Sequence, residues 1–418
     1  MTAAGIFTLL VTAGMFFFLL FERFPPVTVV FLAVVTLLAG GVLSAKEVLE
    51  GFSNEGVGTI AALSILVASF EKNRWNERFA LWLFGKEKTQ RGALTRMMGM
   101  TSAVSAFFNN TPIVLMLTPI VKNWAVKAGF SPSKFLLPLS YAAIFGGMCT
   151  LIGTSTNIVV NAYLKQKGLE GFSMFEFAFI GVPCTIVGII YMVTFGVKWL
   201  PGHQAEGGQK HAVTEIVTKN ELSWKNTIPI FVLIFIIGAA VFNWLPLITV
   251  SFLGVAVLFL TKNMSAAEAK EAIDWNLLVL IGSSFGIAKA LENSGLAVFA
   301  GDWLVRFVNG ASPYIALAVV YGITMLVTEM ITNNAAAAIV LPLAFSLVEK
   351  LQLNPEPFAM AIAIAASAGF ATPIGYQTNL IVYGPGNYRF TDFLKVGPPL
   401  NLLFLIIAVF GIPLFWKF

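Results

Sequence analysis

Charged side chains are scarce in this sequence, at 11% of its 418 residues, whereas a soluble globular protein carries roughly a quarter. Histidine and cysteine are rarer still, with two of each. Cys149 and Cys184 lie inside apolar segments, and His203 and His211 lie in one polar stretch without companion ligands. The sequence therefore excludes a soluble domain of ordinary composition, a disulfide framework and a metal site of the Cys–His type.

Long apolar windows take the place of the missing charge. Hydrophobic residues make up 57% of the chain, and the mean hydropathy is +0.83. Windows of about 20 apolar residues recur from end to end, each long enough to cross a hydrocarbon core of roughly 30 Å. No water is present there to satisfy backbone groups, so such windows must be helices. We predict an all-α polytopic membrane protein, with the lipid bilayer as a partner.

The net charge of +5 does not indicate a nucleic-acid partner. The basic residues occupy short loops between apolar spans, where they act as orientation signals. The first apolar stretch, from about residue 6 to residue 20, has no basic residue before it. This pattern argues against a cleaved signal peptide, and we expect this helix to be part of the fold.

The second half of the chain repeats features of the first half. Residues of the first half recur in the second at offsets that drift from 220 to 223 over the whole half. Chance could supply one or two such pairs but not a steady drift, so we predict an internal duplication. We divide the chain into a first repeat (1–200), a linker (201–225) and a second repeat (226–418). The matched pairs include Pro26 and Pro246, Ser44 and Ser265, Asn110 and Asn333, and Asn157 and Asn379.

Each half shows the same order of predicted helices. Two spans, a short interfacial helix and a third span are followed by two apolar arms around an Asn pair and by two further spans. The arms around Asn109-Asn110 and Asn333-Asn334 are either full spans or re-entrant hairpins. With hairpins each half has five crossings, and an odd number forces the second half to insert upside down. The predicted spans are 4–22, 26–43, 57–71, 134–163 and 173–198 in the first half, and 227–243, 246–262, 275–291, 357–384 and 393–416 in the second.

The distribution of Lys and Arg favours the inverted arrangement. With the linker in the cytoplasm, both termini lie outside and 19 of the 26 basic residues fall on the cytoplasmic side. The expected location is therefore the inner (plasma) membrane of a bacterial-type cell. The densest cytoplasmic cluster consists of Lys72, Arg74, Arg78, Lys86, Lys88 and Arg91.

Two pairs of polar motifs interrupt otherwise apolar helices, at 108–112 and 331–335 and at 151–157 and 371–379. Irregular backbone survives at bilayer depth only where protein or a watery cavity satisfies it. An interrupted helix frees carbonyl oxygens that suit a hard cation such as sodium. The half-helix that begins after each break points free N–H groups at an anion. Four such breaks would form one central site for an anion and cations.

Glu329 is the acidic residue placed closest to these motifs, three residues before Thr332. Its counterpart in the first half is Ala106. The carboxylate is either a proton or cation site or a hydrogen-bonding group that holds the hairpin. The sequence leaves both roles open.

At these motifs the sequence resembles the divalent anion:sodium symporter family, which includes sodium/sulfate and sodium/dicarboxylate carriers. The resemblance covers nearly the whole chain. It is most specific in NNTPIVLMLTPIV, KFLLPLSYAAIFGGMCTLIGTSTN, TEMITNNAAAAIVLP and ATPIGYQTN. It implies two inverted repeats, two re-entrant hairpins, a homodimer and an elevator motion of a transport domain against a scaffold.

The resemblance also implies site residues. The family's Ser-Asn-Thr hairpin tips, which contact substrate, fall on Asn109, Asn110 and Thr111 and on Thr332, Asn333 and Asn334. Sodium lies between each tip and the following unwound segment, near Gly153 and near Gly375. Ser is replaced in both tips, and the family's Thr-Pro-Pro-Asn is replaced by residues 154–157 and 376–379. The expected sodium contacts are Asn110, Gly153, Asn157, Asn333, Gly375 and Asn379.

The expected function is secondary active transport, with sodium as the coupling ion for symport of a small divalent anion. Short donors at Thr154, Ser155, Thr156, Gln377 and Thr378 slightly favour sulfate over a C4 dicarboxylate. An anion exchanger or a cation/proton antiporter of the same architecture are the alternatives, and the sequence does not exclude a passive channel. An intramembrane enzyme is not expected, because it would need His, Asp or metal-ligand clusters at depth.

Overall fold

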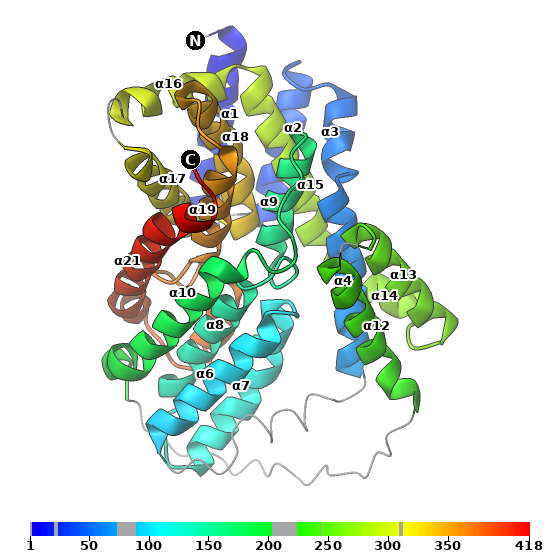
Figure 1. Ribbon diagram of the computed structural model, residues 1–418, viewed down its shortest axis with the longest axis vertical. Coiled ribbons are helices and arrows are strands. Elements are labelled where there is room, and N and C mark those ends of the chain that lie inside the picture. The colour runs from blue at the N-terminus through cyan, green and yellow to red at the C-terminus, as the bar shows by residue number, and fades with distance from the viewer. Residues whose placement is uncertain (1, 21–23, 73–88, 203–223, 243, 309–311) are drawn as a thin grey trace.

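The computed structural model describes residues 2–20, 24–72, 89–202, 224–242, 244–308 and 312–418 (Figure 1). Every regular element in these ranges is a helix, so the all-α prediction is confirmed for the described chain. Nearly all of the predicted linker, both histidines and four members of the basic cluster lie outside the described residues. These four are Arg74, Arg78, Lys86 and Lys88.

Helices of the first half begin and end close to the predicted boundaries. Pro26 opens the second helix, because its fixed φ suits a first turn. The helices are α1 (Ala3–Leu20), α2 (Pro26–Ala39), α3 (Ala45–Phe52), α4 (Glu55–Lys72), α6 (Gln90–Ser105), α7 (Asn110–Lys127), α8 (Ser133–Gly147), α9 (Ser155–Gln166), α10 (Ala178–Tyr191), a π-helical turn η1 (Met192–Gly196) and α11 (Val197–Trp199).

The second half follows with a similar order of elements. The short helices α3 and α14 begin with the same capping box, Ser44 with Glu47 and Ser265 with Glu268. The helices are α12 (Trp224–Val241), α13 (Leu247–Leu260), α14 (Ala266–Ala272), α15 (Trp275–Asn293), α16 (Leu296–Val308), α17 (Pro313–Thr328), α18 (Asn333–Leu351), α19 (Pro355–Ser367), α20 (Gln377–Tyr383) and α21 (Phe390–Phe415).

Two of the predicted spans are each divided into two helices. The span 134–163 consists of α8 and α9 with an irregular segment between Gly147 and Ser155. The span 357–384 consists of α19 and α20 with an irregular segment between Ser367 and Gln377. Both interruptions fall at the polar motifs, where Gly, Thr and Asn replace the apolar run.

Long apolar helices cross the described part of the chain. Four helical stretches are long and apolar enough to span a membrane, and a pair bent by 57° would make a fifth. Further apolar helices are shorter. Large apolar side chains are exposed on outer helices, such as Leu10 at 66% and Leu414 at 77%, which is unfavourable in water and suits lipid. The four stretches are Ala45–Ser69, Ala178–Trp199, Asn333–Leu351 and Phe390–Phe415.

The two halves interleave rather than forming separate globules. Helix α9 packs on α18 and α19 of the second half, and α15 packs on α2 and α3 of the first. Figure 1 shows α12 and α13 beside α4 at one side of the molecule and α10 beside α21 at the opposite side. The central helices α8 and α19 are almost entirely buried.

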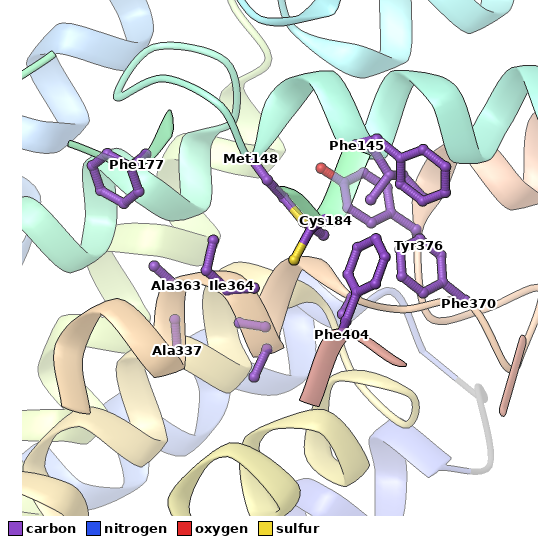
Figure 2. Close-up of a cluster of buried hydrophobic side chains, with 14 of the residues drawn as sticks. Phe145, Met148, Phe177, Cys184, Ala337, Ala363, Ile364, Phe370, Tyr376 and Phe404 are labelled. Carbon is purple, nitrogen blue, oxygen red and sulfur yellow. The ribbon is translucent and has the colours of Figure 1, made fainter. Parts of the chain in front are cut away.

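An aromatic cluster lies between the two broken spans. The rings of Phe145, Phe370 and Phe404 pack against one another with centroids 5.2–5.5 Å apart (Figure 2). The Tyr141 ring packs against that of Phe370 at a tilt of 59°, and its hydroxyl donates a hydrogen bond to the Phe370 carbonyl oxygen at 2.6 Å. Phe145 precedes the first break, and Phe370 lies within the second. The cluster therefore holds the two irregular segments in fixed positions.

Candidate functional site

The first polar centre is built from the turn between α6 and α7. Asn110, the first residue of α7, is fully buried. Its Oδ1 accepts a hydrogen bond from Ser105 Oγ at 2.6 Å, and its Nδ2 donates to the Tyr376 hydroxyl at 2.6 Å. Both ends of the amide are thereby fixed, and the orientation of the oxygen is determined.

The first break is tied to this tip by side chains that satisfy its loose backbone. Asn157 Nδ2 donates to the carbonyl oxygens of Gly147 at 3.3 Å and Thr150 at 2.8 Å. The Thr150 hydroxyl donates to the Ala106 carbonyl and accepts from the Gly153 N–H at 3.1 Å. The Thr150 carbonyl oxygen also accepts from the Gly153 N–H at 3.3 Å, so both of its lone pairs are used.

Close approach of backbone explains why glycine stands at 153. A β carbon there would lie 2.6 Å from the Gly147 carbonyl oxygen and 3.0 Å from that of Ala106. Carbonyl oxygens of the tip and of the break therefore converge on Gly153, in the region where the family resemblance predicts one sodium ion. Neutral oxygen donors of this kind suit a hard monovalent cation.

The second half repeats the same bonds at the same spacing. Asn379 Nδ2 donates to the carbonyl oxygens of Gly369 at 2.8 Å and Thr372 at 3.1 Å. The Thr372 hydroxyl donates to the Glu329 carbonyl at 3.1 Å and accepts from the Gly375 N–H at 2.8 Å. The two centres therefore share one design, a tip and a break joined through a threonine and an asparagine.

Glu329 makes the two centres different. Its carboxylate accepts hydrogen bonds from the Ala371 N–H at 2.8 Å, the Thr372 N–H at 2.9 Å and Asn401 Nδ2 at 2.8 Å. A β carbon at Gly375 would lie 2.6 Å from Glu329 Oε2. Glu329 thus holds the second irregular segment to the hairpin, as one of its two expected roles required, and places a carboxylate beside the second centre.

Polar side chains also connect the first break to the second tip. Asn334 Nδ2 donates to Ser155 Oγ at 3.0 Å, and Thr156 Oγ1 donates to Asn334 Oδ1 at 3.3 Å. Thr154 Oγ1 lies 3.1 Å from the Tyr376 hydroxyl. The four interruptions therefore meet in one hydrogen-bonded network.

A cavity of about 290 Å³ opens beside the first tip. Its lining includes Asn109, Thr111, Ser155 and Gln377, together with acidic residues of α14 and the start of α15. No basic side chain lines it among the residues that the structure describes. No side chain caps the N-termini of α7 and α9, so their free N–H groups and dipole ends are directed to this region.

The structure distributes the predicted site residues over three environments. Asn109, Thr111, Ser155 and Gln377 line the cavity. The central asparagines of both tips and Thr154 lie in the buried network around Tyr376. Other predicted residues make hydrogen bonds within or between the two broken spans. Thr378 accepts from Ser140 Oγ at 2.8 Å, and Asn157 and Asn379 use their Nδ2 to hold carbonyls. Thr332 begins α18 without a capping bond.

Sequence reasoning missed four hydroxyl residues and underrated Tyr376. Ser105 and Thr328 lie five residues before the tip asparagines, and Thr150 and Thr372 lie seven residues before the break asparagines. The sequence does contain a signal for these hydroxyl residues, because Ser105 and Thr328, and likewise Thr150 and Thr372, are related by the internal offset of 222 or 223. The sequence identified Tyr376 only as a residue that replaces part of the family's Thr-Pro-Pro-Asn motif. Its position in the sequence does not predict that its hydroxyl lies between the two tips.

The described residues contain no group of three or more His, Cys, Asp or Glu that could hold a metal. Broken helices with converging neutral oxygens, surrounded by apolar helices that span a membrane, define the class of protein as a membrane transporter.

Comparisons with known proteins agree with this class. The citrate transporter family matches residues 16–348 and 331–418. The chain is 26% identical over 447 residues to the sodium-dependent dicarboxylate transporter SdcS of Staphylococcus saprophyticus, covering 97% of this chain and 85% of that protein. It is 38% identical over 156 residues to sodium/sulfate cotransporter 1 of Chlamydomonas reinhardtii, covering 37% of this chain and 18% of that protein. 

The solved YdaH transporter of Alcanivorax borkumensis has a similar fold, with a TM-score of 0.62 at 12% identity over 88% of this chain and 86% of that one. This likeness concerns the fold alone. The chain belongs to the citrate transporter family, of the type that includes sodium/sulfate and dicarboxylate carriers. The predictions of a transporter and of an integral membrane protein are confirmed, and the family consists of transporters rather than enzymes.

Proposed function

We propose that this protein is a secondary active transporter that couples sodium to the uptake of a small divalent anion, sulfate or a C4 dicarboxylate. The observation that carries the proposal is the pair of matching centres, in which a hairpin tip and a broken helix converge around carbonyl and amide oxygens. Such neutral oxygens bind sodium without a fixed charge. The names of the two relatives, one for dicarboxylate and one for sulfate, support the same cargo classes.

The anion is assigned to the cavity beside the first tip. The cavity has no basic lining residue in the described chain, and Glu271 and Asp274 are among its lining residues. A free dianion would be repelled there, so its charge must be offset by helix N-termini and by bound cations. This electrostatic need is the physical basis for coupling anion binding to sodium binding.

The choice between sulfate and a dicarboxylate is left to experiment. The sequence favoured sulfate on a count of short donors, but the Ser155 and Thr156 hydroxyls donate to Asn334 Oδ1. Two of the five donor residues are therefore used within the protein, which weakens the argument for a compact tetrahedral ion.

The proposed mechanism is an elevator motion of the two hairpins and broken helices against the remaining helices. Two inverted repeats (1–200 and 226–418), a homodimer, outside termini and a cytoplasmic 201–225 linker in the plasma membrane complete the proposal. The shared bonds of the two centres and the shared capping boxes of α3 and α14 support the repeat.

The test is uptake of labelled sulfate and succinate into proteoliposomes, with and without an inward sodium gradient. Citrate is added as a competitor, because the family is named for it. We expect uptake of one dianion that depends on the sodium gradient. Failure of every anion to move contradicts the cargo, and uptake that ignores sodium but requires anion inside the vesicle indicates an exchanger.

A cation/proton antiporter is the second candidate, because Glu329 is a half-buried carboxylate beside the second centre. The discriminating variant is Glu329→Gln. It retains an oxygen for the Ala371 N–H but turns an NH2 group toward the Thr372 N–H. For a symporter we expect weaker but still sodium-driven uptake. Loss of proton-driven exchange of sodium, in a protein that otherwise folds, would favour the antiporter.

A further inference from the structure

The end of the first hairpin that lies away from its tip carries an exposed basic surface, which we call the basic patch. Each of its members is a Lys or Arg with an exposed side chain near a helix end. The proposed topology places the whole patch on the cytoplasmic side. Its members are Arg91 in the first turn of α6, Lys122 and Lys127 near the end of α7, and Lys198 in α11.

The fold brings these residues to one end of the hairpin. Only a short turn separates α6 from α7, so the start of α6 and the end of α7 lie at the same end (Figure 1). Helix α8 begins directly after this end. Lys134 Nζ donates to the carbonyl oxygens of Val197, at 2.6 Å, and of Leu200. This contact fastens α11, which carries Lys198, to the start of α8.

The basic patch has no negative counter-charge in the part of the chain that the structure describes. The chain contains no Asp or Glu from residue 89 to residue 169 or from residue 177 to residue 202, and no patch residue forms an ion pair with a described residue. By contrast, Lys167 of α9 pairs with Glu292 at 2.7 Å. Orientation in a membrane depends on Lys and Arg and little on acidic residues, so orientation alone does not explain the missing carboxylates.

Exposed apolar side chains border the basic patch. Trp199 follows Lys198 and is 46% exposed, and Val126 precedes Lys127 and is 43% exposed. The ring of Phe195 is 57% exposed and lies 5.7 Å from Lys198 Nζ. Rings and aliphatic groups beside ammonium groups are typical of a helix end at the membrane surface, where the apolar part enters the bilayer and the charge stays among the headgroups. This border favours a lipid over an acidic protein or a nucleic acid as the partner.

We infer that the basic patch binds the headgroups of anionic phospholipids in the cytoplasmic leaflet. Each Lys or Arg near an anionic surface changes the partition about fivefold, so several such residues together form an effective anchor. The patch belongs to the hairpin that carries the first tip, so in the proposed elevator motion the contact would tie a moving part to the bilayer surface. Lipid binding itself depends on neither the cargo nor the coupling ion, and only the choice of leaflet rests on the proposed topology.

The test is thermal unfolding of the purified full-length protein in uncharged detergent, with phosphatidylglycerol or phosphatidylcholine added. A lipid that binds the folded state raises the unfolding temperature. We expect this rise with phosphatidylglycerol only, and we expect about 0.5 M KCl to remove most of it by screening. The patch variant combines Lys122→Gln, Lys127→Gln and Lys198→Gln. It should need at least about tenfold more phosphatidylglycerol for the same rise.

A matched control removes the same charge at the other side of the proposed topology. It combines Lys46→Gln, Arg306→Gln and Lys417→Gln, three exposed positions, and should respond as the wild type does. A patch variant that responds like the wild type overturns the inference. Equal loss in the control also overturns it, because net charge alone then explains the response.

Inorganic phosphate, added without lipid, separates a headgroup site from a site for a soluble phosphate. We expect no change in unfolding temperature, and a rise equal to that with phosphatidylglycerol would overturn the lipid as the partner. A response to KCl without any response to phosphatidylglycerol would also overturn it, in favour of an acidic segment of the chain itself. None of these measurements uses transport, so their failure would leave the proposed function intact.

Discussion

Gly153 is the residue where the first tip and the first break come closest. Its missing β carbon would meet two backbone carbonyl oxygens, at 2.6 and 3.0 Å, and backbone cannot move aside as a flexible side chain can. We predict that Gly153→Ala separates the tip from the break, lowers sodium-dependent uptake at least tenfold and destabilises the protein by about 1–3 kcal/mol, as overpacking does.

Gly99 provides the matched control for this prediction. It lies in α6 of the same hairpin, and an added β carbon would meet nothing within 4 Å. Gly99→Ala should be neutral or stabilising by up to about 1 kcal/mol, through helix propensity. Unfolding temperature and uptake are measured for both variants. Equal behaviour of the two would show that close approach at Gly153 has no functional consequence.

The roles of individual asparagines show where inference from residues ends. The sequence identified Asn157 and Asn379 as polar groups at depth, because a buried amide in an apolar helix needs a partner. The family resemblance adds sodium contacts for both residues, which stay a prediction. The structure shows that their Nδ2 atoms hold loop carbonyls in place, a role that a one-dimensional pattern does not reveal.

At the scale of elements, the end of α9 connects the central helices to the outer ones. Lys165 pairs with Glu55 of α4 at 3.2 Å, and Lys167 pairs with Glu292 of α15 at 2.7 Å. Tyr163 donates to the same Glu292 carboxylate at 2.9 Å. If the proposed elevator moves α9 relative to α4 and α15, these pairs must break in each cycle.

We predict that charge reversal at this contact changes the transport rate. Glu292→Lys places like charges together and should alter the uptake rate several-fold, and the double variant Glu292→Lys with Lys167→Glu should recover most of it. The coupling is expected at about 1 kcal/mol, because both groups are partly exposed and screened. Rates are compared at low and high ionic strength. If the effects of the two substitutions on the uptake rate are additive in the double-mutant cycle, the ion pair has no role in the transport cycle.

At the scale of the whole molecule, the inverted plan has a direct test on α3 and α14. Lys46 and Lys270 are exposed residues of these two helices, which share the same capping box. In the proposed topology Lys46 lies outside and Lys270 lies in the cytoplasm. With Cys149 and Cys184 replaced by serine, a membrane-impermeant thiol reagent should label Lys46→Cys in intact cells and Lys270→Cys only after permeabilisation. Labelling of both positions from one side would exclude the inverted arrangement.

Much of the architecture follows from the sequence because bilayer physics leaves few choices. Apolar windows of sufficient length must be helices, and most of their observed boundaries lie within a few residues of the prediction. Polar motifs placed the interruptions near 151–157 and 371–379, because free backbone groups there need Asn, Thr and Gly around them. The internal offset of 222 or 223 residues already pairs the two centres in the sequence.

Only the tertiary structure decided which polar atoms face one another. Asn110, Thr154 and Asn333 meet at the Tyr376 hydroxyl. Asn110 and Thr154 lie more than 200 positions before Tyr376 in the sequence, whereas Asn333 lies much closer to it. The hydrogen bonds from the second break to the Glu329 carboxylate likewise depend on how the turn before α18 packs against residues 371–372. Hydrogen bonding has a range of about 3 Å, so roles of this kind are set by distances that sequence periodicity does not contain.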